Sequence, residues 1–337
     1  MRSSKVVLFA LLVLVMLQVP TDVFSQHPQY TFKVAGTGNK GIPFTDILYY
    51  GSKDKVEEYS KGRIRVDVYP GNALGGERET IEMLMQGTLE ISMVSDQTYS
   101  IFEPRWGIKD LPYFVATRQE AWDFFDGEGG KKFTEMMLEK GIRILAYGEN
   151  SIRQVSNSKR EIHTPADLRG LKIRVPENRA MMDWFTSMRA IPAIIPFPEM
   201  MPALQQKVVD GQENGMASMF YMNITDVQKY YTDTNHNYSC IPVAINENLW
   251  KRLPPDLQSV VVRAATEAVK EERESVVKLE KAAMENLEKA GMKVTILSPA
   301  ERSKFVESAK PTWQKYSKQF GEDYMDWAFA LTGKSWR

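Results

Sequence analysis

The stretch Arg63-Ile-Arg-Val-Asp-Val-Tyr69, closed by Pro70-Gly71, decides the fold class. Its apolar and polar residues alternate, which predicts a half-buried strand that ends at the Pro-Gly pair. Helices are predicted on both sides of it, over 43–60 and over 77–85. Further strands are predicted at 30–35 and 89–94. This β-α-β-α-β order favours a mostly parallel sheet with helices on its faces.

A second α/β unit is predicted farther along the chain. Its expected strands are 143–147, 151–155 and 171–175. Three helices are expected: one that starts at 164, and two that cover 181–188 and 198–206. The two units are expected to join near 148–152 and again near 238–246. The chain is therefore expected to form two α/β lobes.

A long helix is predicted over 255–291, which lacks an internal breaker and is rich in Glu, Lys, Ala and Leu. About 35 helical residues span roughly 50 Å, more than one small domain. We therefore expect this helix to brace both lobes. A coiled coil is the alternative, but Val260, Val269 and Val276 do not keep a strict 3.5-residue period.

Composition excludes several classes of protein. The 337 residues contain 43 Lys and Arg against 43 Asp and Glu, and this zero net charge speaks against a nucleic-acid binder. Cys240 is the single cysteine, so neither an intrachain disulfide nor a cysteine-rich metal site is possible. The three histidines are far apart in sequence. We expect no cofactor and no metal, although a pair of carboxylates stays open as a catalytic site.

Residues 1–25 have the layout of a secretory signal. Arg2 and Lys5 precede an apolar run of 12 residues, 6–17, whereas spanning a bilayer needs about 20. An uncleaved anchor is the alternative. We expect a periplasmic protein that is not inserted in the membrane.

The motif Gly36-Thr-Gly-Asn-Lys-Gly41 matches a dinucleotide fingerprint between a strand and a helix. The fingerprint also needs an acid at the end of the second strand, whereas Asp67 lies inside that strand. A glycine-rich turn at the sheet edge is the other interpretation. One alternative function is thus an exported enzyme that acts on a sugar acid or uses a dinucleotide at 36–41.

Three stretches together resemble the periplasmic solute-binding subunits of TRAP transporters, the tripartite ATP-independent periplasmic importers, in the dicarboxylate and sialic-acid type. They lie within 62–90, 157–176 and 197–214, and Leu171-Lys-Ile-Arg-Val-Pro176 and Asp210-Gly-Gln-Glu-Asn214 are the most specific motifs. An ABC-type receptor shares the two-lobed plan, but the long helix and the Arg-Val-Pro motif argue against it.

The resemblance implies a receptor without catalysis. Such a protein holds a small organic acid in a cleft between two lobes and delivers it to a permease driven by an ion gradient, made of a small and a large membrane subunit. The implied division is a signal at 1–25, lobe I at 26–150 plus 240–275, and lobe II at 151–239 plus 276–337.

The resemblance also implies site residues. An arginine in the Leu-Lys-Ile-Arg-Val-Pro strand of the family pairs with the ligand carboxylate, and Arg174 occupies that place. Arg153 matches a second family arginine, Asn214 a cleft amide, and Phe197 an aromatic wall. Glu77, in the first matching stretch, is also expected to contact the ligand. By strand alternation alone, Arg174 would be read as a solvated surface residue.

The remaining candidates come from position along the chain. Ser95 and Asp96 directly follow the strand at 89–94, at the edge where clefts form. Trp184 and Tyr238 are candidate walls, with core packing as the alternative. Glu177 stands where the family often has Asn. If Asp96 and Glu177 face the cleft, a monocarboxylate with hydroxyl groups is favoured over a dicarboxylate.

Overall fold

The computed structural model describes residues 27–115 and 117–337. The predicted secretory signal at 1–25 lies outside these described residues. Within them, none of the helices combines the length and the apolar character needed to cross a membrane.

One mixed sheet runs through the molecule in the order β2-β1-β3-β8-β4-β7-β5-β6, with β9 beside β8. Its strands are β1 Tyr30–Gly36, β2 Ile64–Tyr69, β3 Ile91–Met93, β4 Ile142–Asn157, β5 Lys172–Val175, β6 Ile191–Ile194, β7 Gly211–Gly215, β8 Tyr230–Asn246 and β9 Lys293–Thr295. Parallel pairs lie at each end, where β1 joins β2 and β3, and where β5 joins β6 and β7. The antiparallel strands β4 and β8 connect the two ends.

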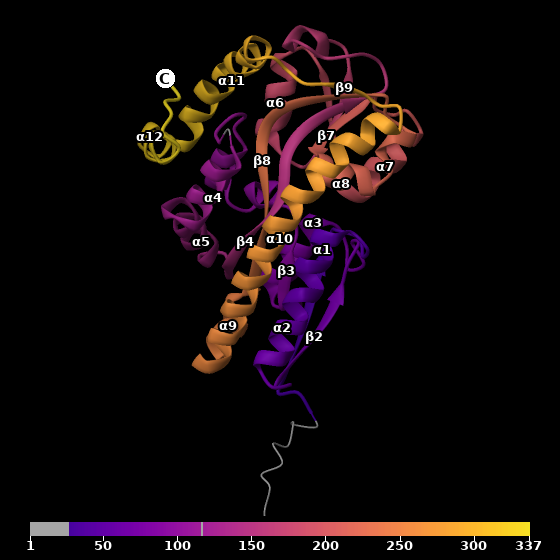
Figure 1. The fold of residues 1–337 in the computed structure, drawn as a ribbon. Helices are drawn as coiled ribbons and strands as arrows, with labels where there is room; N and C mark the ends of the chain where they lie inside the picture. The colour runs from indigo at the N-terminus through magenta and orange to yellow at the C-terminus, as the bar shows by residue number, and fades with distance from the viewer. Residues whose placement is uncertain (1–26, 116) are drawn as a thin grey trace, which may run out of the picture.

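Helices flank this sheet in two lobes (Figure 1). They are α1 Pro43–Asp46, α2 Ser52–Tyr59, α3 Glu77–Gln86, α4 Arg118–Asp126, α5 Glu128–Leu138, α6 Arg179–Ser187, α7 Phe197–Gln205, α8 Met216–Tyr221, α9 Glu247–Arg252, α10 Pro255–Lys289, α11 Pro299–Phe320 and α12 Glu322–Leu331. We call β1–β3 with α1–α3 the first lobe, and β5–β7 with α6–α8 the second lobe. The expected two-lobed α/β architecture is therefore present, while the exact chain boundaries of the lobes stay a prediction.

Two local expectations differ from the structure. The separate strands expected at 143–147 and 151–155 are one strand, β4, whose pairing with β8 shifts register between Glu149 and Ser151. Such a bulge bends a strand without ending it, which explains the apparent break in the sequence. The helix expected over 43–60 contains a π-helical turn at Ile47–Gly51.

The long helix α10 contacts both lobes, as expected (Figure 1). Near its start, Leu257 belongs to the apolar core that contains Ile64 of the first lobe. Near its end, Leu287 belongs to the core that contains Leu204 of the second lobe. One amphipathic helix thus fills a place in both cores and links the lobes along their length.

Candidate functional site

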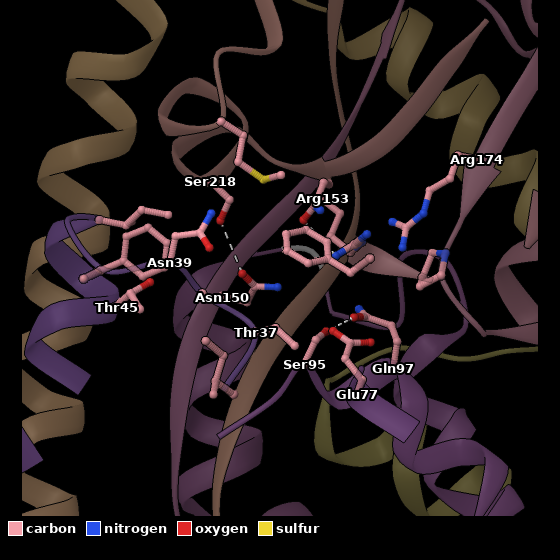
Figure 2. A pocket seen from close by; sticks show the side chains of 18 residues that line it. Thr37, Asn39, Thr45, Glu77, Ser95, Gln97, Asn150, Arg153, Arg174 and Ser218 are labelled. Atoms are coloured by element: carbon pink, nitrogen blue, oxygen red, sulfur yellow. Dashed lines mark hydrogen bonds between the residues drawn. The ribbon is translucent and has the colours of Figure 1, made fainter. Parts of the chain in front are cut away.

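A cavity lies where the two lobes meet, and we call it the interlobe cavity. Together with the open space at its mouth, it encloses about 610 Å³. It is lined by Thr37, Gly38, Asn39, Ile42, Phe44, Thr45, Glu77, Ser95, Gln97, Asn150, Arg153, Arg174, Pro176, Phe197, Asn214, Ser218, Met222 and Ile241. Figure 2 shows the two arginines entering it from one side, with Glu77, Ser95 and Gln97 on the other.

Arg174 is a buried cation that has no ion-pair partner in the part of the chain that the structure describes. On β5 its neighbours Ile173 and Val175 are packed in the core, so the alternating Arg174 side chain takes the opposite face. Its Nε donates to the Ile195 carbonyl at 2.8 Å, and the side chain is only 1% exposed. Among the described residues, no carboxylate lies within 4.0 Å of its guanidinium. Burial lowers the pKa of Arg174 to about 10.

Arg153, by contrast, is held by its own protein. From β4 its Nε donates to Glu213 Oε2 at 2.6 Å, and Nη2 donates to Glu213 Oε1 at 2.8 Å. Its Nη1 donates to Asn214 Oδ1 at 3.1 Å. Burial opposes its charge, but Glu213 raises the pKa of Arg153 above its ordinary value. The positive charge of Arg153 is therefore already balanced, and its orientation is fixed.

Glu213 is in turn supported from β8. His236 Nε2 lies 3.1 Å from Glu213 Oε2, and His236 Nδ1 lies 2.8 Å from Thr234 Oγ1. Although burial works against ionisation, Arg153 and His236 lower the pKa of Glu213 to about 2. Glu213 is thus a fixed carboxylate that holds Arg153 in place.

The first lobe supplies the opposite wall. Glu77 begins α3, and Thr98 Oγ1 donates to its Oε2 at 2.7 Å. Burial raises the pKa of Glu77, and the nearby Arg174 and Arg153 counteract this effect. Ser95 and Gln97 lie beside it and are hydrogen-bonded to each other. This wall offers uncharged donors and acceptors together with one carboxylate.

The glycine motif at 36–41 serves close packing. A Cβ atom on Gly36 would lie 2.2 Å from the Tyr49 ring, and one on Gly38 would lie 2.5 Å from Thr45 Oγ1. The Gly41 N–H donates to the Asp46 carboxylate at 3.1 Å, so an acid of the protein occupies the place of an incoming phosphate. These residues do not fit a dinucleotide. In the part of the chain that the structure describes, no cluster of His, Cys, Asp and Glu suits a metal ion either.

The structure brings six of the ten candidate residues to the interlobe cavity, namely Arg174, Arg153, Asn214, Phe197, Glu77 and Ser95. It places the other four elsewhere, namely Asp96, Trp184, Glu177 and Tyr238. All six lie at strand ends, at helix starts or on the cavity-facing side of a strand. Their role in binding a ligand stays a prediction.

The two acidic residues among the other four do not line the cavity. Asp96, next to the cavity-lining Ser95, is fully buried and forms an ion pair with buried Lys109 at 2.5 Å. Glu177 lines a separate surface hollow next to Arg78 and Arg179. Neither carboxylate can therefore select a ligand in the interlobe cavity by direct contact.

The two aromatic residues pack in the core. Trp184 is fully buried, and its Nε1 donates to Ser308 Oγ of α11 at 3.0 Å. Tyr238 is buried against Phe125, with its hydroxyl 3.4 Å from Glu149 Oε2. Core packing was the alternative interpretation for both residues, and the structure shows both of them packed in the core.

Several polar lining residues were not singled out from the sequence. Thr37 and Asn39 lie in the glycine-rich turn at the end of β1, a position at which ligand clefts form in α/β sheets. The glycine-rich turn at 36–41 is therefore a sequence signal for these two cavity residues. Asn150 and Ser218 reach the cavity from β4 and α8, and Asn150 Nδ2 donates to Ser239 Oγ at 3.2 Å. No sequence signal marks them.

Comparison with known proteins identifies close relatives. The family model described as bacterial extracellular solute-binding protein, family 7, matches residues 52–319. A solute-binding protein of Verminephrobacter eiseniae is 32% identical over 268 residues, which cover 80% of this chain and 79% of the relative. The 2,3-diketo-L-gulonate-binding periplasmic protein of Escherichia coli is 30% identical over 235 residues, 69% of this chain and 72% of the relative.

Solved structures show the same fold. A TRAP periplasmic solute-binding protein from Polaromonas, bound to D-erythronate, has a TM-score of 0.86 and 30% identity, and the match covers 90% of this chain and all (100%) of that chain. A TRAP periplasmic solute-binding protein from Sulfurospirillum deleyianum, with bound succinate, has a TM-score of 0.84 and 27% identity, with 90% and 100% covered. The fold of this chain is thus that of two-lobed TRAP solute-binding proteins.

Proposed function

Because this chain belongs to the bacterial extracellular solute-binding proteins of family 7, we propose that it is a receptor that captures a small organic acid in its interlobe cavity. Its activity is reversible binding without turnover. The observation that carries the proposal is the state of Arg174, a buried guanidinium at the cavity wall that lacks a carboxylate partner among the described residues. A ligand carboxylate would supply that partner.

The chemistry of the guanidinium suits this role. Burying a cation without a partner is unfavourable, and an incoming carboxylate removes the imbalance. The two terminal nitrogens of Arg174 form a planar fork that matches the two oxygens of a carboxylate. Because its Nε is already bonded to the Ile195 carbonyl, the fork is held in one orientation. Water exclusion from the closed cavity strengthens the charge pair.

Ligand binding also favours closure of the lobes. The Arg174 side of the cavity belongs to the second lobe, and the Glu77 side belongs to the first (Figure 2). A ligand that contacts both sides binds the closed arrangement more tightly than the open one, and it shifts the population by that difference in affinity. Strands β4 and β8 and helix α10 connect the lobes, so they would form the hinge about which the lobes move.

We place the receptor in the periplasm, after export directed by residues 1–25, and its partners are the small and large membrane subunits of an ion-gradient-driven TRAP permease. The family membership and the signal-like sequence support this assignment. The dinucleotide enzyme is disfavoured because the Asp46 carboxylate takes the Gly41 N–H that would hold a phosphate.

A binding measurement on Arg174 variants tests the proposal. A thermal-shift screen over an organic-acid library identifies the tightest acid, since a ligand stabilises the folded state in proportion to its affinity and concentration. Calorimetric titration of that acid should then show at least a tenfold loss for Arg174→Ala, because losing one partner of a buried charge pair costs about 2–5 kcal/mol. The control is Arg169→Ala, an exposed arginine just before β5.

Unchanged affinity in Arg174→Ala would contradict the proposal. So would chemical conversion of the bound acid by the wild-type protein, followed by mass spectrometry of the recovered ligand. Equal losses in both arginine variants would show a general charge effect and would remove Arg174 from the site.

A further inference from the structure

The interlobe cavity has an asymmetric arrangement of charge. Its ionisable lining residues are Arg174, Arg153 and Glu77. The charge of Arg153 is balanced by Glu213, to which it donates two hydrogen bonds. Two charges without a direct ion-pair partner among the described residues remain, the cation of Arg174 on the second lobe and the carboxylate of Glu77 on the first, and each favours the charged form of the other. A bound molecule that spans the lobes therefore meets a positive group at one end and an acidic group at the other.

Glu77 has acceptor capacity left for a ligand. Thr98 donates to its Oε2, and within the described residues no Lys, Arg or His lies within 4.0 Å of it. An ionised carboxylate only accepts hydrogen bonds, so a neighbouring ligand group has to donate. A hydroxyl group meets that need. A second ligand carboxylate does not, because two carboxylates without an intervening cation repel each other in a buried site.

The groups next to Glu77 are also suited to hydroxyls. Ser95 lines the cavity beside it, and Gln97 keeps its amide in place by donating to Asn237 Oδ1 at 3.2 Å. Asn150, held by Ser239, adds an amide at the middle of the cavity. None of these side chains carries a positive charge that could neutralise a second anionic group.

We propose that the ligand is a hydroxylated monocarboxylic acid of the aldonate type, and that Glu77 is the specificity-determining residue that rejects dicarboxylates of the same length. The inference rests on the proposed function, since it assigns the carboxylate end of the ligand to Arg174. It deepens that function by assigning the opposite end of the ligand to the Glu77 wall.

Matched pairs of acids test the inference. Erythronate and meso-tartrate differ only in that the terminal CH₂OH of the first is a carboxylate in the second, and gluconate and glucarate differ in the same way. Calorimetric titration of the wild-type protein should show the better-bound monocarboxylate binding at least tenfold more tightly than its dicarboxylate partner. In Glu77→Gln this ratio should fall at least tenfold, chiefly through a gain in dicarboxylate affinity.

The matched control is Glu79→Gln, which removes an exposed charge from the same turn of α3 and should leave the ratio unchanged. A wild-type preference for either dicarboxylate, binding of neither monocarboxylate, or an unchanged ratio in Glu77→Gln would overturn the inference. Should Glu77→Gln fail to fold, the wild-type ratios alone decide the ligand class.

The two proposals fail in different ways. If acids bind and Arg174→Ala abolishes their binding while Glu77→Gln leaves the ratio unchanged, only the ligand class is wrong. If Arg174→Ala leaves the affinity unchanged, the carboxylate end is misplaced and the receptor proposal itself fails.

Discussion

Arg174 and Arg153 are both buried guanidinium groups, yet their environments differ. Arg153 forms an ion pair with Glu213 at 2.6 Å, while the one acceptor of Arg174 within residues 27–115 and 117–337 is the Ile195 carbonyl. A buried charge without a partner lowers the stability of the ligand-free protein, and a bound anion would remove this cost. This difference predicts opposite effects of the same substitution on stability.

Arg174→Met should raise the free energy of unfolding of the ligand-free protein by about 1 kcal/mol or more, because an uncompensated buried charge is replaced by an apolar side chain. Arg153→Met should lower it by about 3–5 kcal/mol, because Glu213 then loses its partner. Urea unfolding without ligand measures both. A large loss of stability in Arg174→Met would show that the protein itself balances that charge.

At single residues, the sequence predicts where polar side chains lie along a strand, but not whether they face solvent or a closed cavity. The alternation of 171–175 puts Arg174 on the polar face, and the structure buries that side chain in the wall of the interlobe cavity. Ser95 and Asp96 show the same limit. The sequence predicts that both lie at the edge where the cavity forms, but not that Asp96 pairs with Lys109 while Ser95 lines the cavity.

Helix α10 is hydrogen-bonded to strand β4 through the buried side chain of Glu272. Glu272 Oε2 accepts a hydrogen bond from the Glu149 backbone N–H at 2.9 Å, close to the β4 bulge. Burial raises the pKa of Glu272 well above its ordinary value of 4.5. Glu272 is therefore a neutral acid in the folded state over a pH range in which it is ionised in the unfolded chain.

This pKa difference predicts a pH effect on stability. Above pH 4.5 the unfolded chain releases the proton of Glu272 and the folded state retains it, so its contribution to stability falls as pH rises. Glu272→Gln keeps a neutral acceptor and lacks this loss. The variant should thus gain stability relative to wild type as the pH rises above 4.5.

Urea unfolding at several pH values measures the effect, with Glu274→Gln on the exposed side of α10 as the control. A stability difference between Glu272→Gln and wild type that does not change with pH would show that Glu272 is ionised in the folded protein.

Among the elements, those with regular patterns were predicted and those that depend on contacts were not. Strands with alternating residues and the unbroken α10 follow from local sequence alone. The short 3₁₀ turns at Asp96–Ile101 and Pro104–Asp110 do not. They depend on packing between side chains: Trp106 of the second turn stacks on Tyr99 of the first at 4.9 Å and on Phe133 of α5 at 4.6 Å.

In the whole molecule, the site depends on the order of strands in one sheet. Glu77 follows β2 and Arg174 lies on β5, and they face each other because β8 and β4 pass between the two parallel regions. The sequence indicated two α/β units and a bracing helix. It could not give this strand order, because pairing between β3 and β8 or between β4 and β7 joins residues far apart in the chain.

The strand order also explains why α10 and the two long strands have to act together. The helix contributes to the cores of both lobes, so any closing motion bends or slides it against β4, with which it is in extensive contact. Closure around a ligand is then a movement of two packed bodies about common elements, as in other hinge and shear transitions.

The most direct test of the account is a crystal structure of the protein with its tightest-binding organic acid. We predict that the two carboxylate oxygens lie about 2.7–2.9 Å from the terminal nitrogens of Arg174, with the rest of the ligand directed to the Glu77 wall. A carboxylate bound elsewhere in the cavity, or a protein carboxylate paired with Arg174 in the complex, would contradict the account.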